Sequence, residues 1–233
     1  PYFDQYTLIT KTVYDRDGNP HKLTLGFIGF LPPQIMQWDK KNLEGKVSTK
    51  DIKAVAELLV PQMKAEGADI IVAIPHSGIN TTAYSENAKA ENSSWYLADV
   101  EGIDAIMFGH SHLTFPSIDF AKTSNVDLEK GTIKGVPSVM PGYWGSHLGI
   151  IDLTLALNED DESWAVVDSK VEARALNPES EADAALTALV KPDHDATLEY
   201  MDQVIGESTD DIFSFLAVVK DDPSIQIVSD AQK

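Results

Sequence analysis

Hydrophobic and polar residues alternate along the first thirty positions of the chain. The stretch YTLITKTVYD, residues 6–15, is rich in β-branched residues and has the alternation of a half-buried strand. The turn sequence RDGN, residues 16–19, follows it, and HKLTLGFIGF, residues 21–30, reads as a second strand. The pattern therefore predicts a β-hairpin at the start of the chain.

Residues 48–67 change to helical spacing, with apolar residues three and four positions apart. We expect Ser48 or Thr49 to cap the N-terminus of this helix and Gly67 to end it. Pro61 is expected to bend or break the helix near its middle, because proline has no backbone N–H to donate to the preceding turn.

Two short, uninterrupted apolar runs come next. DIIVAIP, residues 69–75, and IDAIMFG, residues 103–109, have the composition of strands that are buried on both faces. NSSWYLADVEG, residues 92–102, lies between them and predicts a short helix. Helices that alternate with strands over short connections predict an α/β fold in which helices cover a sheet.

The pattern changes again beyond residue 130. Residues 147–157 and 163–176 predict two further strands. Residues 180–206 predict a long helix that is interrupted near Pro192.

Composition narrows the range of partners. The 233 residues carry a formal net charge of −19, which disfavours nucleic acid and anionic membranes. No stretch approaches the roughly 18 uninterrupted apolar residues of a membrane span. Cysteine is absent, which excludes disulfides, zinc–thiolate sites and cysteine nucleophiles. An anionic substrate would need local positive charge, which a divalent metal ion can supply.

Histidines follow both of the predicted buried strands. His76 lies in PHSG after the first strand, and His110 and His112 lie in GHSH after the second. Because ligands bind beyond the carboxyl ends of strands in such sheets, we expect these imidazoles to meet at one rim and to bind a metal ion. In an extended segment, residues 110 and 112 would point to the same side. The alternative interpretation is that each histidine is a hydrogen-bonded structural residue.

Further polar residues near these histidines are candidates for contact with a substrate or with the metal ligands. The alternative for each is a role in packing or at the surface. The candidates are His147, Ser77, Asn80 and Ser111.

Several motifs together resemble a known family. DIIVAIPHSG followed by GIDAIMFGHSH resembles the second half of a calcineurin-like metallophosphoesterase. More closely, the chain resembles the branch that contains periplasmic 5′-nucleotidases and 2′,3′-cyclic-nucleotide 2′-phosphodiesterase/3′-nucleotidases. The segments GFIGFLPPQIMQWDKKNLEGKV, PSVMPGYWGSHLGIIDLTL and DDPSIQIVSDAQ resemble the cyclic-phosphodiesterase subgroup in particular. The resemblance covers nearly the whole chain. It implies an α/β fold that is the C-terminal half of a four-layer α-β-β-α sandwich.

The resemblance also implies a site with two divalent metal ions of the Zn, Mn, Co or Mg class. His76 and His110 would bind one ion, and His112 the other. The family's D-x-H, G-D and G-N-H motifs do not occur in the 233 residues. The catalytic residues are therefore expected upstream of Pro1, none of them in this chain. By itself the chain is expected to be inactive and to hold at most one ion weakly.

The domains and the function are likewise implied by the resemblance. Residues 1–182 would be the second half of the catalytic domain, 183–202 a linking helix, and 203–233 the first elements of a C-terminal nucleotidase domain. The implied function is that of a fragment of a two-metal phosphoesterase.

Such an enzyme would hydrolyse 2′,3′-cyclic nucleotides and 3′-nucleotides with metal-bound hydroxide, in the periplasm or outside the cell. Its partners would be the nucleotide substrate, the missing N-terminal half of the catalytic domain and the missing C-terminal domain. The alternatives are a 5′-nucleotidase or UDP-sugar hydrolase of the same family, and a non-catalytic metal- or ligand-binding domain.

Overall fold

The computed structural model describes residues 3–86, 89–158, 160 and 163–233. The chain divides into two compact units, Pro1–Pro178 and Glu179–Lys233. No helix in these described stretches is long and apolar enough to cross a membrane.

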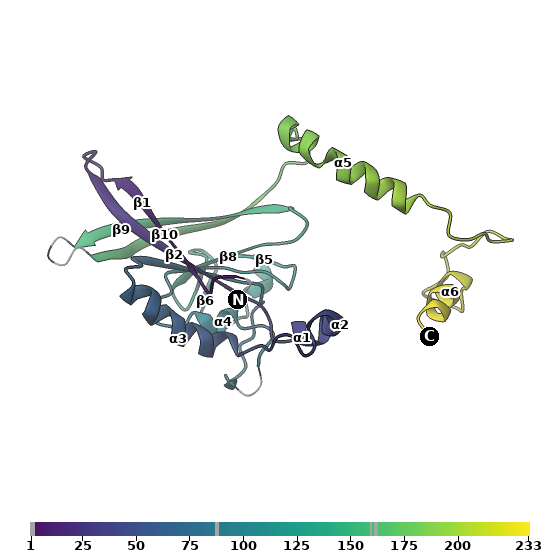
Figure 1. The fold of residues 1–233 in the computed structure, drawn as a ribbon, viewed down its shortest axis with the longest axis horizontal. Coiled ribbons are helices and arrows are strands. Elements are labelled where there is room, and N and C mark those ends of the chain that lie inside the picture. The colour runs from purple at the N-terminus through teal and green to yellow at the C-terminus, as the bar shows by residue number, and fades with distance from the viewer. Residues whose placement is uncertain (1–2, 87–88, 159, 161–162) are drawn as a thin grey trace. The chain divides into compact units, whose positions relative to one another are not determined.

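The first unit is built on a mixed sheet (Figure 1). Over the described residues its strand order is β1-β2-β3-β4-β8-β7-β6, and β5 pairs with β8 outside this path. The strands are β1 (Thr7–Tyr14), β2 (Pro20–Phe30), β3 (Ile70–Pro75), β4 (Ala105–Met107), β5 (Thr114–Phe115), β6 (Val126–Asp127), β7 (Thr132–Ile133) and β8 (Val136–Pro141). Short helices lie in the connections: α1 (Ile35–Trp38), α2 (Lys40–Leu43), α4 (Ser94–Leu97) and the 3₁₀ helix η2 (Ile118–Phe120).

The predicted N-terminal hairpin is confirmed. Strands β1 and β2 pair antiparallel, from Thr7 opposite Phe27 to Tyr14 opposite Pro20. The Asp15 carboxylate closes the turn by accepting hydrogen bonds from the backbone N–H groups two and four residues later, at 2.9 and 2.8 Å. The turn sequence therefore determines the register of the hairpin by local hydrogen bonding.

Helix α3 (Ile52–Ala65) lies along one side of the sheet (Figure 1). Its N-cap is Asp51, whose side chain accepts from the backbone N–H three residues later, so the predicted caps Ser48 and Thr49 were wrong. Pro61 does not break the helix, because α3 runs as one helix with Pro61 inside it. Residues on both sides of Pro61 are buried in the core, and this packing offsets the hydrogen bond that proline cannot make.

Gly67 ends the region of α3 as predicted. Its φ of +98° is in the left-handed region, and the next residue donates its N–H back to the carbonyl of Met63 at 2.9 Å. This is the Schellman arrangement, for which glycine is preferred because it has no Cβ to clash.

The two apolar runs form the parallel centre of the sheet. Strand β3 pairs parallel with β2 on one side and with β4 on the other, and β4 pairs parallel with β8. The carboxyl ends of these strands therefore lie at the same edge of the sheet. The helix predicted over residues 92–102 is shorter than expected, since only α4 (Ser94–Leu97) is helical and turns complete the connection.

A long antiparallel hairpin of β9 (His147–Asn158) and β10 (Ser163–Ala175) completes the first unit. It confirms the two strands that the alternation predicted. The loop between β6 and β7 approaches β10 closely, because a Cβ on Gly131 would lie 2.4 Å from the Cβ of Val171.

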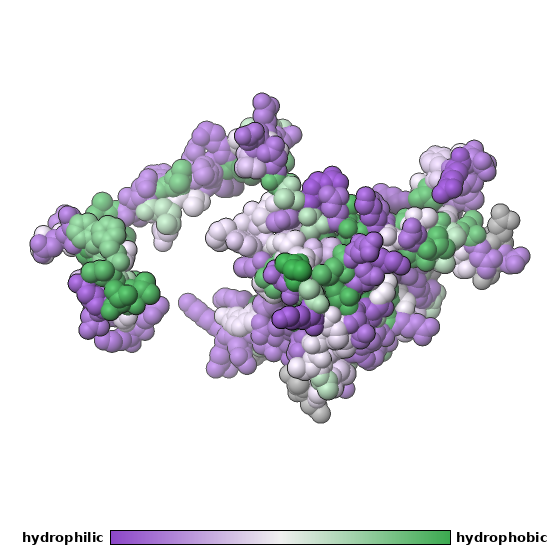
Figure 2. All heavy atoms as spheres, turned by 180° about the vertical axis from the view of Figure 1, so that it is seen from behind, coloured by the Kyte–Doolittle hydropathy of each residue, from purple (hydrophilic) through white to green (hydrophobic). Residues whose placement is uncertain are grey.

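The second unit contains α5 (Ala184–Met201) and α6 (Pro223–Ala231). The predicted interruption near Pro192 was wrong, because α5 is assigned continuously through that residue. Hydrophobic side chains lie on the surface of this unit (Figure 2). The most exposed of them are Ile205, Val218, Phe215 and Val204.

Gly131→Ala is expected to lower the free energy of unfolding by roughly 2–5 kcal/mol, because the new Cβ would overlap Val171 and because φ is +67°. Gly18→Ala is the matched control. It also has a positive φ but no atom within 4 Å of the added Cβ, so we expect a loss of only about 1–2 kcal/mol. Urea denaturation of both variants measures the difference, and equal losses would contradict the close approach.

Asp15 gives the fold a predictable pH dependence. Hydrogen bonds from the Asn19 side chain, then from His21 and the turn backbone, hold the pKa of Asp15 well below its usual range. A lowered pKa in the folded state favours folding above the unfolded pKa, and the gain is lost as pH falls through the folded pKa.

We therefore expect Asp15→Asn to lower the melting temperature at neutral pH, and the difference from wild type to shrink as the pH falls below about 4. Thermal melts over a pH series test this, with Asp17→Asn in the same turn as the control. A constant difference at all pH values would contradict the assignment.

Candidate metal centre

The candidate ligands lie where the strands β3 and β4 end. His76 directly follows β3, and its backbone N–H donates to the carbonyl of Phe30 at the end of β2. His110 and His112 follow β4 after a two-residue connection. The expectation of an extended segment at His110 and His112 was wrong, because their φ angles are +75° and +58°. In this left-handed backbone, the side chains of alternate residues need not point to the same side.

The structure brings His76 and His110 together. Their ring centres are 5.1 Å apart, with the ring planes at 64°. Two imidazoles on one tetrahedral ion, with metal–nitrogen distances of about 2.0–2.1 Å, have ring centres roughly 5 Å apart. The separation of this pair therefore fits shared coordination of one divalent ion.

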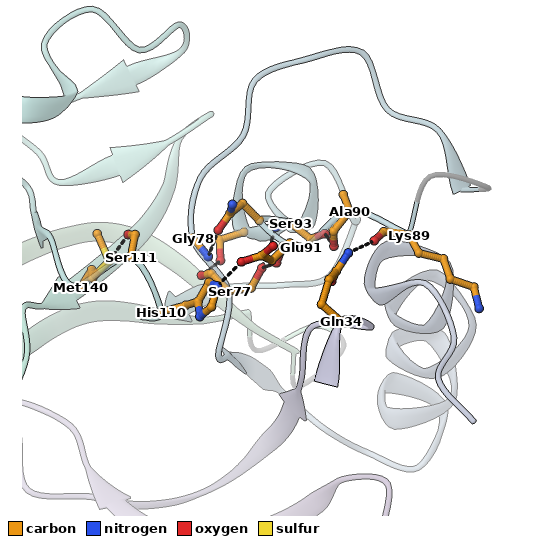
Figure 3. Close-up of polar contacts among 12 residues, drawn as sticks. Gln34, Ser77, Gly78, Lys89, Ala90, Glu91, Ser93, His110, Ser111 and Met140 are labelled. Atoms are coloured by element: carbon orange, nitrogen blue, oxygen red, sulfur yellow. Dashed lines mark hydrogen bonds and ion pairs between the residues drawn. The ribbon is translucent and has the colours of Figure 1, made fainter. Parts of the chain in front are cut away.

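Two further side chains surround His110. Its Nε2 lies 2.6 Å from the Oε1 of Glu91, an interaction drawn in Figure 3. Trp38, at the end of α1, stacks on the imidazole, with ring centres 5.4 Å apart and planes at 27°. His110 is thus contacted at one ring nitrogen and on one face.

His112 has different neighbours. Its ring is exposed and stacks on Tyr143, with centres 5.3 Å apart and planes at 24°. Tyr143 in turn packs edge-on against the fully exposed Trp144. Within the part of the chain that the structure describes, no group of three or more His, Asp or Glu side chains is placed to hold a metal ion. The donors in this arrangement are therefore a histidine pair with a nearby carboxylate, and His112 lies outside that pair.

The electrostatics at the pair favour neutral imidazole. Partial burial, and then the charges of His110 and His112, lower the pKa of His76 below its ordinary value. A neutral imidazole has the free lone pair that metal coordination requires, whereas a protonated one has none.

The other predicted site residues lie around this pair. Ser77 is completely buried, and its hydroxyl donates to the carbonyl of Glu91 and accepts from the N–H of Ser93, both at 2.6 Å. Asn80 accepts a hydrogen bond from the backbone two residues later, at 3.0 Å. The hydroxyl of Ser111 points to the sulfur of Met140 (Figure 3).

His147 lies at the start of β9, where its Nδ1 is 2.9 Å from the Oγ of Ser146. A Cβ on Gly142 would lie 3.3 Å from the same nitrogen, and the N–H of Gly142 donates to the carbonyl of Leu113. His147 is therefore part of the loop that carries Tyr143, beside the segment that follows His112.

Three residues with a place in the site were missed by sequence reasoning: Glu91, Trp38 and Tyr143. Each lies in an irregular connection or in a one-turn helix, where no periodicity predicts which side chain faces the histidines. The only signal was composition, because an acidic residue and two aromatic residues occur in the connections beyond the ends of the strands.

Comparison with known proteins defines the class. No protein-family model matches the chain. Among solved structures, the calcineurin-like phosphoesterase YfkN from Bacillus subtilis superposes with a TM-score of 0.81 at 44% identity, over 87% of this chain and 60% of that one. A putative 5′-nucleotidase from Staphylococcus aureus is 20% identical with a TM-score of 0.58, which shows a shared fold. The chain belongs to the calcineurin-like phosphoesterases and has the C-terminal half of their fold.

The curated relatives are more specific. The chain is 48% identical to the 2′,3′-cyclic-nucleotide 2′-phosphodiesterase/3′-nucleotidase of Salmonella typhimurium, over 100% of its own length and 36% of that protein. It is 49% identical to the trifunctional nucleotide phosphoesterase protein YfkN of Bacillus subtilis, over 99% of its length and 16% of that protein. Over nearly its whole length the chain is therefore similar to these nucleotide phosphoesterases, and it spans about a third or less of the length of these relatives.

Ser77→Ala is expected to lower the free energy of unfolding by about 1–3 kcal/mol, because the buried carbonyl of Glu91 and N–H of Ser93 would lose their partner. Ser111→Ala is the control, since Ser111 is exposed and its hydroxyl donates to the sulfur of Met140, a weak acceptor. We expect it to change stability by less than about 0.5 kcal/mol. Chemical denaturation compares the two variants, and equal effects would show that the Ser77 hydroxyl does not hold the loops together.

Proposed function

We propose that the natural protein containing this chain is a metal-dependent phosphoesterase that hydrolyses 2′,3′-cyclic nucleotides and 3′-nucleotides. The proposal rests on one observation above all. His76 and His110 pair at the carboxyl ends of adjacent parallel strands, with ring centres at the separation expected for ligands of one divalent ion. The names of the curated relatives support the substrate class.

In this proposal His76 and His110 bind one divalent ion, and His112 binds a second. A bound divalent cation would offset negative charge on the phosphate oxygens of the substrate. The histidines themselves hold the metal and do not act as bases, because a coordinated nitrogen has no lone pair left to accept a proton. Partial burial lowers the pKa of His76, which favours the neutral imidazole that a metal ion requires.

His76, His110 and His112 supply only part of the donors that two adjacent divalent ions require. Two like charges need a bridging carboxylate or a comparable anionic ligand between them. We propose that the missing ligands and the catalytic acid lie outside these residues, in the part of the relatives' length that the chain does not span. The 233 residues alone are accordingly expected to give no turnover.

The location is proposed to be the periplasm or the outside of the cell. The absence of cysteine is compatible with such an oxidising compartment, where a stray thiol would react. A 5′-nucleotidase or a UDP-sugar hydrolase of the same fold remains the alternative, because these enzymes would use the same metal ligands and differ in the part that binds the substrate.

His110→Ala in the natural protein is expected to lower kcat/KM for 2′,3′-cyclic AMP by about a hundredfold or more, because it removes a metal ligand. The matched control is His194→Ala, a histidine on the exposed surface of α5, which we expect to retain wild-type activity. Steady-state assays with saturating Mn²⁺ measure both variants. A His110→Ala variant with near wild-type activity would overturn the ligand assignment.

The same assays separate the substrate classes. The wild-type protein is compared on 2′,3′-cyclic AMP, 3′-AMP, 5′-AMP and UDP-glucose. The proposed function requires the highest kcat/KM on the first two substrates. A preference for 5′-AMP or for UDP-glucose would select one of the alternatives.

A further inference from the structure

One contact of the histidine pair is not explained by metal binding itself. The Nε2 of His110 lies 2.6 Å from the Oε1 of Glu91, which is short for a hydrogen bond between an imidazole and a carboxylate (Figure 3). The His110 side chain is 19% exposed and that of Glu91 is 39% exposed, so the contact is partly shielded from water. Such a contact is screened less by solvent than an ion pair at a fully exposed surface.

The chemistry of the contact selects one tautomer of His110. An ionised carboxylate can only accept a hydrogen bond, so Nε2 must carry the proton. In the neutral imidazole, Nδ1 then holds the lone pair. Nδ1 is thus the nitrogen that Glu91 leaves available to a metal ion.

We propose that Glu91 is a positioning residue that fixes His110 as the Nε2–H tautomer, so that Nδ1 is the metal donor. The inference rests on the proposed function in so far as His110 binds a metal ion. The tautomer is a property of the metal-free protein and can be measured separately. Partners that orient metal-ligating histidines in this way typically contribute about 10–100-fold to metal affinity.

The segment that carries Glu91 is held against the loop that carries His76. The carbonyl of Glu91 accepts a hydrogen bond from the hydroxyl of Ser77, which directly follows His76. The side chain of Asn92 accepts from the N–H of Gly78 at 3.1 Å. Both loops are therefore joined at the point where the two imidazoles meet, and the carboxylate is placed by the backbone contacts of its neighbours.

A side chain at position 78 would disturb this junction. A Cβ on Gly78 would lie 2.6 Å from the Oδ1 of Asn92, closer than Cβ atoms approach other atoms in proteins. The absence of a side chain at Gly78 leaves room for the Asn92 amide to accept from its N–H. The sequence around His76 is thus suited to hold the carboxylate as well as the imidazole.

The remaining freedom of the His110 ring is limited by its other contacts. Trp38 stacks on one face, and His76 packs at an angle to the ring. A rotation of the ring by 180° would exchange the nitrogen that faces Glu91 for a carbon. Loss of that hydrogen bond opposes the rotation, so one ring orientation and one tautomer are favoured together.

The test uses the natural protein and its variants Glu91→Ala, Glu91→Gln and, as a matched control, Glu57→Gln. Glu57 pairs with Lys53 on the surface of α3, so its replacement removes a carboxylate contact elsewhere. Long-range ¹H–¹⁵N NMR spectra of the metal-free protein at about pH 8, where histidines are mostly neutral, report the tautomer of His110. Isothermal titration calorimetry with Zn²⁺ reports the metal affinity.

Wild type and Glu57→Gln are expected to show the Nε2–H tautomer at His110. Glu91→Ala is expected to show a mixture of tautomers and to bind Zn²⁺ about 10–100-fold more weakly. Glu91→Gln is expected to recover part of the affinity, because the amide oxygen still accepts from Nε2–H. A general loss of structure in Glu91→Ala would appear as a changed melting temperature. Glutamine at position 91 would not by itself restore such a loss.

The outcomes separate this inference from the proposed function. An Nδ1–H tautomer in wild type, or unchanged tautomer and affinity in Glu91→Ala, would overturn the role of Glu91. If His110→Ala binds Zn²⁺ as tightly as wild type, the metal role of His110 fails instead. The tautomer measurement, made without metal, then still decides whether Glu91 fixes the ring.

Discussion

The parallel pairing of β3 with β2 and β4 is the constraint on which the site depends. Parallel strands end at the same edge of a sheet, so the segments that follow β3 and β4 meet there even though 34 positions separate His76 from His110 in the sequence. The strands are short and almost entirely buried, and their register leaves little freedom for the histidines to move apart.

The buried hydroxyl of Ser77 holds together the loops that follow the sheet. It joins the segment of His76 to the segment of Glu91, in a region without regular secondary structure. Buried backbone groups need such partners, and a loop that lacks them is unstable. The stability of this junction and the orientation of the metal ligands therefore depend on the same hydrogen bonds.

Exposed aromatic residues lie beside His112. Tyr143 stacks on His112, and Trp144 extends beyond it into solvent with a φ of +52°. The similarity to the calcineurin-like phosphoesterase YfkN accounts for the sheet. The greater length of the relatives is the proposed source of the further ligands that two metal ions would need.

The sequence by itself determined the elements whose cause is local. The sequence predicted the β1–β2 hairpin and the strands β9 and β10. Continuous apolar runs predicted β3 and β4, and Gly67 marked the end of α3, because each depends on the spacing or conformation of neighbouring residues. Placing histidines at the ends of β3 and β4 followed from the same patterns.

Only the tertiary structure decided what depends on distant contacts. Packing in the core offsets the hydrogen bond that Pro61 cannot make, so α3 continues through it. The left-handed backbone at His110 and His112 directed one ring to Glu91 and Trp38 and the other to Tyr143. These pairings join residues from separate irregular loops, whose course is determined by the surfaces they cover and not by any repeating pattern of their own.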